Sequence, residues 1–287
     1  AASDVYKRQT VYFVPETTAE SELTIAGSGA VIPDSKAATG KVQLVAKKLA
    51  LRVGFSAELD EDSIIGWTAK LRQQAIRAME DAIDNVLLNG DTETGGTGNV
   101  NLVDAAPAAT AKYLALNGIR KLWLVTTTTN SVDGGGAAIT LAQIRAARFS
   151  MSPAYAAYPQ NLAVIVPTEQ YAKMLDMPEF LTMDVMGDRA TALTGQIGAV
   201  DGIPVLVSNE YVKANSAGKV SNTGSNNTLG SLSIVYKPGW TVGYRRRVNA
   251  TIDFLSYLDS YQLTSTVRLA FTNRDGEVAA GVYNSLV

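Results

Sequence analysis

The clearest pattern in the chain is an apolar stripe that recurs every three or four residues between residues 63 and 88. This spacing predicts a long amphipathic helix. The acidic run at 60–62 would lie at the positive end of the helix dipole, and Asp62 or Ser63 would cap the helix. Asn89–Gly90 predicts a left-handed stop at its end. The stripe consists of Ile64, Leu71, Ala75, Ile76, Met79, Ile83, Val86 and Leu87.

The chain before this helix has the alternation of extended structure. Residues 10–55 predict a long two-stranded ribbon with a loop tip at 33–40, which holds the Pro, Asp, Ser and Gly of a turn. The strand 41–55 changes phase partway along, which predicts a bulge near Lys47–Lys48. Because an isolated ribbon is marginal in water, we expect it to lie on its own domain or on a neighbouring subunit.

After the helix, short apolar runs alternate with helical patterns between 137 and 240, which predicts an α/β unit. Thr140 and Gln143 have the spacing of a capping box, and Thr168 is expected to cap a later helix. Strands are expected at 121–126, 162–166, 203–208 and 232–236, and loops at 91–99, 127–136 and 213–230, the second of them at a domain boundary.

Residues 241–272 return to period-two alternation, which predicts β-structure. One face of this segment carries Leu263, Ser265, Val267, Leu269 and Phe271. A turn is expected at 274–276.

The amino-acid composition excludes several kinds of catalytic and metal-binding site. The 287 residues include no Cys and no His, with 46% hydrophobic and 18% charged residues. Disulfides, thiolate nucleophiles, Cys/His zinc sites and Ser-His-Asp triads are therefore impossible. No apolar run approaches about 18 residues, so no transmembrane helix is expected, and no signal segment is apparent.

Charge gives one candidate surface. The net charge is −2, whereas proteins that grip nucleic acid usually carry a strong basic patch. The dense basic cluster is Arg245, Arg246 and Arg247. In a regular strand these side chains point to alternate faces. We interpret the cluster as a solvated or subunit-bridging strand in preference to a DNA-facing contact.

The remaining motifs do not support catalysis. The nearest match to a phosphate loop ends at Gly40–Lys41, but Ser35 stands where its first Gly belongs. The loop 91–99 lacks the spacing of a calcium loop, and the carboxylates at 60–62 are explained by the helix start. We therefore predict no catalytic residue, no metal site and no cofactor, and a protein that is not an enzyme.

The order of the pieces carries a resemblance. The long helix is preceded by the segment KLALRVGFSAELDEDSII and ends with DAIDNVLLNGD. It is followed in turn by the segments NLAVIVPTEQYAKMLDM, GQIGAVDGIPVLVSNEY and EVAAGVYN. This series resembles the major capsid proteins of tailed phages, the Hong Kong ninety-seven type fold, from about residue 10 to the end. The motifs that match are Ser56 to Leu59 before the helix, Gly90 at its end, Val164 to Leu175, and Gly202 to Val205.

The resemblance implies an α+β fold in three parts. Residues 10–55 would form an extended E-loop. A peripheral domain would combine 56–136, including the spine helix at 63–88, with the return strands 241–272. Residues 137–240 would form an α/β axial domain, followed by a C-terminal segment, 273–287.

The resemblance also implies a function. Copies of the chain would assemble as a homo-oligomer of pentamers and hexamers into an icosahedral shell that encloses double-stranded DNA without sequence-specific binding. Scaffolding protein, protease and portal would be its partners, with no membrane, and assembly would take place in the host bacterial cytoplasm before the protein resides in the virion. An encapsulin-like nanocompartment shell of the same fold is the alternative, followed by an α/β enzyme.

Two short segments complete the expectations. The E-loop residues Pro33, Asp34, Lys36 and Lys41 are candidates for inter-subunit contacts. Either lysine could enter the Lys–Asn cross-link that some relatives form, although we favour a role in solubility. Residues 1–9, AASDVYKRQ, look like translated sequencing adapter, so we expect the natural N-terminus to be missing.

Overall fold

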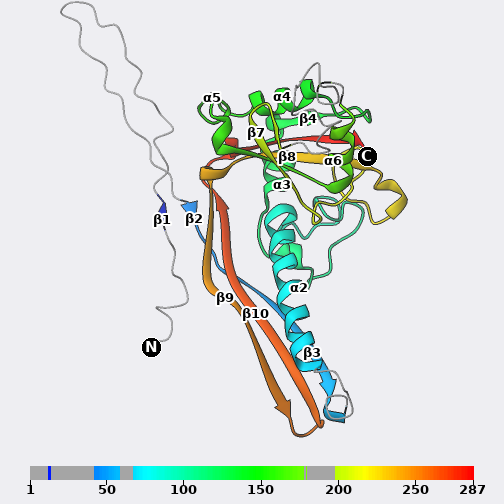
Figure 1. Ribbon diagram of the computed structural model, residues 1–287, viewed down its shortest axis with the longest axis vertical. Helices are drawn as coiled ribbons and strands as arrows, with labels where there is room; N and C mark the ends of the chain where they lie inside the picture. Colours follow the sequence, from blue (N-terminus) through cyan, green and yellow to red (C-terminus); the bar gives the residue numbers. More distant parts are fainter. Residues whose placement is uncertain (1–11, 14–41, 59–66, 178, 180–197) are drawn as a thin grey trace, which may run out of the picture. The chain divides into compact units, whose positions relative to one another are not determined.

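The computed structural model describes residues 12–13, 42–58, 67–177, 179 and 198–287 (Figure 1). The chain divides into two units, 1–45 and 46–287. In the first, β1 (Tyr12–Phe13) pairs antiparallel with β2 (Val42–Gln43). The expected adapter segment, the loop tip at 33–40 and the helix cap at 62–63 lie outside the described residues.

The second unit contains two sheets and several helices. Its strands are β3 (Lys47–Ser56), β4 (Ser131–Asp133), β5 (Leu162–Val166), β6 (Ala199–Val200), β7 (Ile203–Val207), β8 (Leu229–Tyr236), β9 (Trp240–Leu255), β10 (Ser260–Asn273) and β11 (Ala279–Leu286). Its α-helices are α2 (Trp67–Asn89), α3 (Ile119–Lys121), α4 (Leu141–Ser150), α5 (Pro153–Ala156) and α6 (Thr168–Leu175). Short helical turns are η1 (Lys112–Leu114), η2 (Leu122–Thr126), η3 (Thr128–Asn130), η4 (Pro159–Asn161), η6 (Gly224–Asn226), η7 (Lys237–Gly239) and η8 (Gly276–Val278).

The first sheet and α2 form a two-layer structure that we call the arm. Its three antiparallel strands have the order β3-β10-β9, and α2 packs on one face of them (Figure 1). Along β10 the residues Leu263, Ser265, Val267 and Leu269 are buried, while those between them are half-buried. This alternation confirms the predicted face, since side chains on a strand alternate between its two sides.

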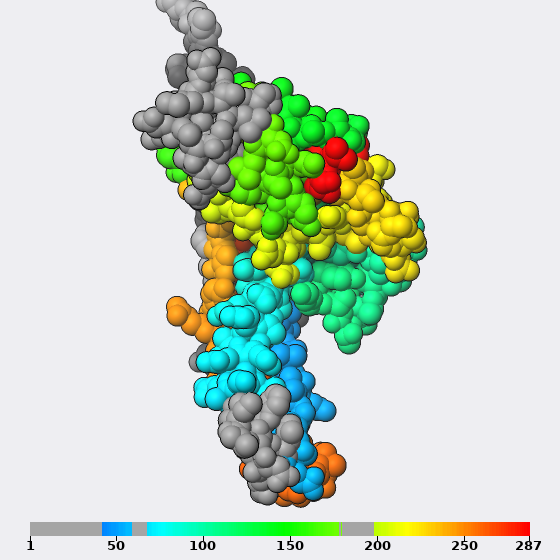
Figure 2. Space-filling model, turned by 45° about the vertical axis from the view of Figure 1, so that its right-hand side comes forward, coloured from blue at the N-terminus to red at the C-terminus, as the bar shows by residue number. Residues whose placement is uncertain are grey.

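The predicted spine helix is confirmed as α2, whose 23 described residues span about 35 Å. Its buried positions, Met79, Ile83 and Val86, meet Val267 and Leu269 of β10 in one apolar cluster. The helix is therefore held by the sheet that the base of the ribbon and the C-terminal strands form together. Its exposed side lies open along the arm in Figure 2, where α2 is cyan.

The end of α2 differs from the prediction. Gly90 does not adopt a left-handed conformation. Its N–H instead continues the helix by donating to the Val86 carbonyl at 2.9 Å, and its own carbonyl accepts from the Gly118 N–H at 2.7 Å. A Cβ at Gly90 would lie 2.4 Å from the Leu116 carbonyl oxygen. Glycine is needed here because another part of the backbone passes too closely for a side chain.

The second sheet has six strands in the order β4-β11-β8-β5-β7-β6, and we call it and helices α4, α5 and α6 the head. It is mixed: β5 runs parallel to β7 and antiparallel to β8, and β11 runs parallel to β4. The predicted strands β5, β7 and β8 are confirmed. The segment 273–287, which the sequence left as a separate C-terminal piece, supplies β11 inside this sheet (Figure 1).

Residues 121–126 were expected to form a strand, and that prediction is wrong. They form the end of α3 and the helical turn η2. Their β-forming side chains are used differently: Leu122, Trp123 and Leu124 are all buried in a cluster with β8 and β11 residues. Tertiary packing has overridden local propensity here. The following loop, 127–136, also contributes β4 to the head sheet, which the loop prediction missed.

Two further local predictions need correction. The strand expected over 41–55 is broken into β2 and β3 by residues 44–46, so the phase change is a break in the strand, not a bulge. Thr168 does not cap α6: the cap position is Pro167, and no side chain caps it. The Thr168 hydroxyl donates to Oδ1 of Asn209 at 2.9 Å instead.

The loop at 213–230 is polar, as expected, but it is tied to its surroundings. Val220 exchanges backbone hydrogen bonds with Val100 and Val103 at 2.9 Å. The Ser221 hydroxyl donates to the Asp104 carboxylate, and Asn227 closes the loop through the Ser221 backbone. These bonds join the loop to residues that follow α2.

The capping box at the start of α4 is confirmed. Oγ1 of Thr140 accepts from the Gln143 N–H at 3.3 Å, and Oε1 of Gln143 accepts from the Thr140 N–H at 3.0 Å. Replacing Thr140 by Ala is expected to cost about 0.5–2 kcal/mol of stability, because the cap satisfies N–H groups that the helix leaves unpaired. Denaturant unfolding measures this, with Thr140→Ser, which keeps a capping hydroxyl, as the control. Equal losses in the two variants would contradict the capping role.

Candidate interaction surfaces

The arginine cluster lies on β9, an edge strand of the arm sheet, at a place where the pairing with β10 is irregular. From Asn249 to Arg246 β9 advances three residues while β10 advances two, and a second register shift follows between Arg268 and Leu269. Such bulges interrupt the regular alternation of faces. Arg245, Arg246 and Arg247 are all exposed in this part of the strand, which agrees with a solvated or subunit-bridging cluster.

The cluster continues across the sheet as a basic row. Arg268 of β10 is in register with Arg246 of β9 on one side and with Lys48 of β3 on the other. Residues directly opposite in antiparallel strands share one face, with Cβ atoms roughly 5 Å apart. Arg52, another cation of β3, lies on the same face, because it is four residues from Lys48 along the strand. The sequence cluster is therefore one end of a basic surface drawn from three strands.

An acidic patch lies on α2. Glu80, Asp81 and Asp84 are exposed, and Glu210, from the loop after β7, comes close to them. Partial burial raises the pKa of Asp84, and the negative charges of Glu210, Asp81 and Glu80 raise it further. The three acidic neighbours that contribute to this shift lie near Asp84, which marks a local concentration of negative charge. Sequence analysis missed the patch, because Glu210 joins it only through the tertiary fold.

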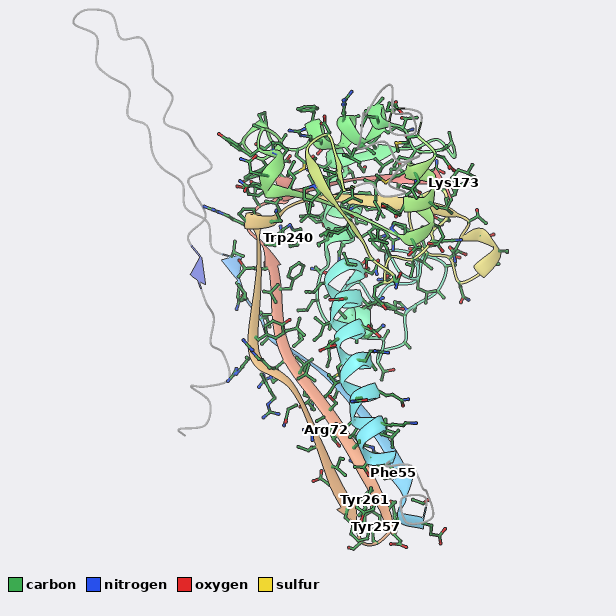
Figure 3. All side chains as sticks on the ribbon, in the orientation of Figure 1. Phe55, Arg72, Lys173, Trp240, Tyr257 and Tyr261 are labelled. Atoms are coloured by element: carbon green, nitrogen blue, oxygen red, sulfur yellow. The ribbon has the colours of Figure 1, made fainter. Side chains whose placement is uncertain are left out.

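The far end of the arm carries exposed aromatic and apolar side chains. Phe254, Tyr257 and Leu258 are 51%, 78% and 60% exposed around the β9–β10 turn. The Tyr261 ring lies 5.5 Å from that of Phe55 and 5.1 Å from that of Phe254 (Figure 3). An apolar patch of this kind on a soluble surface marks a candidate contact site. The run FLSYLDSY was a usable sequence signal, since few turns carry so many apolar residues.

A buried polar cluster joins the arm to the head. Arg120 is fully buried; its two terminal nitrogens donate to Oδ1 of Asn89 at 3.2 Å and to the Gly218 carbonyl at 2.5 Å. Asn89 also donates to the Glu210 carbonyl at 2.7 Å, so the end of α2 is tied to two points of the connection between β7 and β8. Burial lowers the pKa of Arg120. Removing one member of this cluster would leave the other buried polar groups without hydrogen-bond partners, which is costly. The cluster therefore holds the end of α2 and the connection between β7 and β8 in one arrangement.

The loop 91–99 is likewise organised by a buried carboxylate. Asp91 is fully buried, and its Oδ1 accepts from Nζ of Lys121 at 2.6 Å. Its Oδ2 accepts from the Val100 N–H at 2.9 Å. The expected solvated Gly/Thr loop is therefore anchored at one end by a largely buried ion pair.

The described residues contain few of the other expected sites. The E-loop candidates Pro33, Asp34, Lys36 and Lys41 fall outside the described residues. Within the described ranges, no three Asp or Glu side chains come together as a metal site. None of the described helices is both long enough and apolar enough to cross a bilayer. An open polar groove runs along α2, lined by Lys70, Gln73, Gln74, Ile76, Arg77 and Glu80.

Solved structures show what fold this is. A chain from Mycobacterium phage Adephagia matches with a TM-score of 0.65 and 12% identity, over 98% of this chain and 86% of that one. The capsid of a native GTA particle matches with 0.63 and 12% identity, over 96% and 85%. The mature capsid of bacteriophage PhiM1 gives 0.59 and 12% identity, over 95% and 81%. The fold is that of phage capsid proteins, and the predicted α+β Hong Kong ninety-seven type fold is confirmed.

A curated relative agrees with this fold. The major capsid protein of Escherichia phage T5 is 25% identical over 252 residues, which cover 86% of this chain and 48% of that protein. The chain thus spans about half the length of the curated relative that it matches. No protein-family model matches the chain. The resemblance to tailed-phage major capsid proteins, first seen in the order of short motifs, is confirmed.

Proposed function

We propose that the chain is the shell-building subunit of a tailed phage or prophage, whose copies assemble into the icosahedral capsid that encloses the double-stranded DNA genome. The observation that carries the proposal is the capsid fold over almost the whole chain, together with the identity to the phage T5 major capsid protein. The chain acts as a structural protein and not as an enzyme.

The parts of the chain fit this role. The arm is the peripheral domain and the head is the axial domain, with β3 belonging to the arm sheet and β11 to the head sheet. The segment before β3 is the E-loop, whose Pro33, Asp34, Lys36 and Lys41 reach a neighbouring subunit. The long two-layer arm exposes both of its faces, as a subunit that contacts several neighbours requires. Repeated contacts between unlike surfaces close into rings, and rings of five and six close into a shell.

The shell holds DNA without gripping it. Affinity for phosphates grows with the number of Lys and Arg contacts, and the net charge of this chain is −2. Packaged DNA can therefore slide along the wall. A scaffolding protein, a protease and a portal act with the subunit during assembly in the host cytoplasm.

Electron microscopy and sedimentation of the expressed chain, with its scaffolding protein, test the proposal. Closed shells of uniform size are expected, and particles from induced host cells should hold DNA that resists nuclease. A chain that sediments only as a monomer contradicts the shell role. Particles that hold a folded enzyme in place of DNA would favour the nanocompartment alternative.

A further inference from the structure

Charge is divided between the two faces of the arm at one level along its length. Val267 and Leu269 of β10 pack against Met79 and Ile83 of α2. Arg268, between them, must point to the opposite side of the sheet, because successive strand residues alternate. Its cross-strand neighbours Lys48 and Arg246 share that side. The sheet face turned away from α2 therefore carries three cations side by side.

Such a row is unfavourable in the isolated chain. Like charges directly opposite on neighbouring strands repel each other. Among the described residues, no ion pair includes Lys48, Arg246 or Arg268. Lys48 and Arg246 are exposed and Arg268 is half-buried. The sheet face is thus open to an acidic surface that would remove the repulsion.

The complementary surface is present on the same chain, on the other layer of the arm. With Met79 and Ile83 turned toward the sheet, residues one, two and five positions after Met79 lie on the outward side of α2. These are Glu80, Asp81 and Asp84, all exposed, with Glu210 beside them. Arg77, three residues before Glu80 and four before Asp81, is exposed on the same side and offsets one of these charges, which leaves the patch negative. At this level the arm has an acidic helix face, an apolar middle and a basic sheet face.

We propose that in the shell the basic row of Lys48, Arg246 and Arg268 on one copy is covered by the acidic patch of Glu80, Asp81, Asp84 and Glu210 on a neighbouring copy. This inference rests on the proposed shell function and names the contact that sets the register between adjacent arms. The two surfaces lie on opposite sides of a single arm, so the contact joins unlike surfaces, as ring-forming contacts do. A two-fold contact through either face would instead bring like charges together.

Charge exchange between the two surfaces tests the proposal in the full chain. One variant reverses the row with Lys48→Glu and Arg268→Glu, and a second reverses the patch with Glu80→Lys and Asp84→Lys. Each is expected to lower the yield of closed particles about tenfold or more, because like charges then face each other across the contact. The variant that carries all four changes restores the complementarity, and its yield is expected to return to within about threefold of the unmodified chain.

Matched measurements separate the possible causes. Denaturant unfolding of the soluble subunits should show all variants folded. Lys112→Glu with Lys173→Glu, neither of which belongs to the two charged surfaces, should leave the yield unchanged as a control for net charge (Figure 3 labels Lys173). The proposal is overturned if the variant with all four changes is folded but still fails to assemble. It is also overturned if the variant with Lys48→Glu and Arg268→Glu assembles normally. If that variant forms normal shells that fail to retain DNA, the basic row contacts nucleic acid and not a neighbouring copy. If the unmodified chain itself forms no particles, the shell function fails first.

Discussion

Replacing Trp123 by Ala is expected to destabilise the subunit by about 3–5 kcal/mol, the range for deleting a large buried aromatic side chain. Trp123 is fully buried in the cluster that links η2 to β8 and β11. Its Nε1 donates to Oγ of Ser233 at 2.8 Å. The ring lies so close to Gly281 that a Cβ there would be 2.4 Å from it. Its removal leaves a cavity and takes away one of the two hydrogen-bond partners of the Ser233 hydroxyl, which keeps the Tyr211 hydroxyl as its other partner.

Denaturant unfolding of the soluble subunit measures the loss, which is a large part of the roughly 5–15 kcal/mol that stabilises a typical domain. The stability of Trp123→Phe should lie between that of the unmodified chain and that of Trp123→Ala, because phenylalanine retains most of the packing but loses the hydrogen bond. Tyr257→Ala is the matched control, since its ring is 78% exposed at the end of the arm, and a change within about 0.5 kcal/mol is expected. Equal effects at the two aromatic positions would show that Trp123 does not support the fold as inferred.

The second large effect is expected at Ile83. Truncation to Ala should cost about 2–5 kcal/mol, because Ile83 lies between α2 and the sheet and its loss leaves a cavity among Met79, Val267 and Leu269. Arg72 on the same helix is exposed (Figure 3), and Arg72→Ala should cost well under about 1 kcal/mol.

The two helix variants should therefore separate in both stability and assembly. Ile83→Ala is expected to give unfolded or insoluble subunits and few particles, whereas Arg72→Ala gives folded subunits. Unfolding midpoints and particle yields, measured side by side, check this. An unchanged midpoint for Ile83→Ala would mean that α2 does not bury this face, and that it is not the spine of the arm.

The sequence by itself determined the elements whose cause is local. The apolar stripe through Met79 and Ile83 predicted α2, because helix geometry places residues three and four apart on one face. Thr140 and Gln143 predicted the start of α4, because a capping box needs only four consecutive residues. The alternation in 263–271 predicted the buried face of β10 for the same kind of reason. The order of these elements was enough to indicate the capsid fold.

Only the tertiary structure decided features that depend on distant partners. Trp123 lies in a helical turn and not in a strand because Ser233 and Gly281, more than 100 residues away, form the site that accepts its ring. β11 enters the head sheet by pairing with β8 and β4. Gly90 is required by the passage of residues 116–118. None of these pairings leaves a periodic signal in the local sequence.

The charged surfaces of the arm show the same division. The run Arg245–Arg247 was visible in the sequence, but the register shifts beside it and the pairing of Arg246 with Arg268 appear only in the folded sheet. Its extension to Arg268 and Lys48 joins residues some 200 positions apart, and Glu210 meets α2 only after folding. Sequence determines which charges exist. Strand register and helix packing decide which of them share a face, because a one-residue shift in a strand moves a side chain to the opposite side.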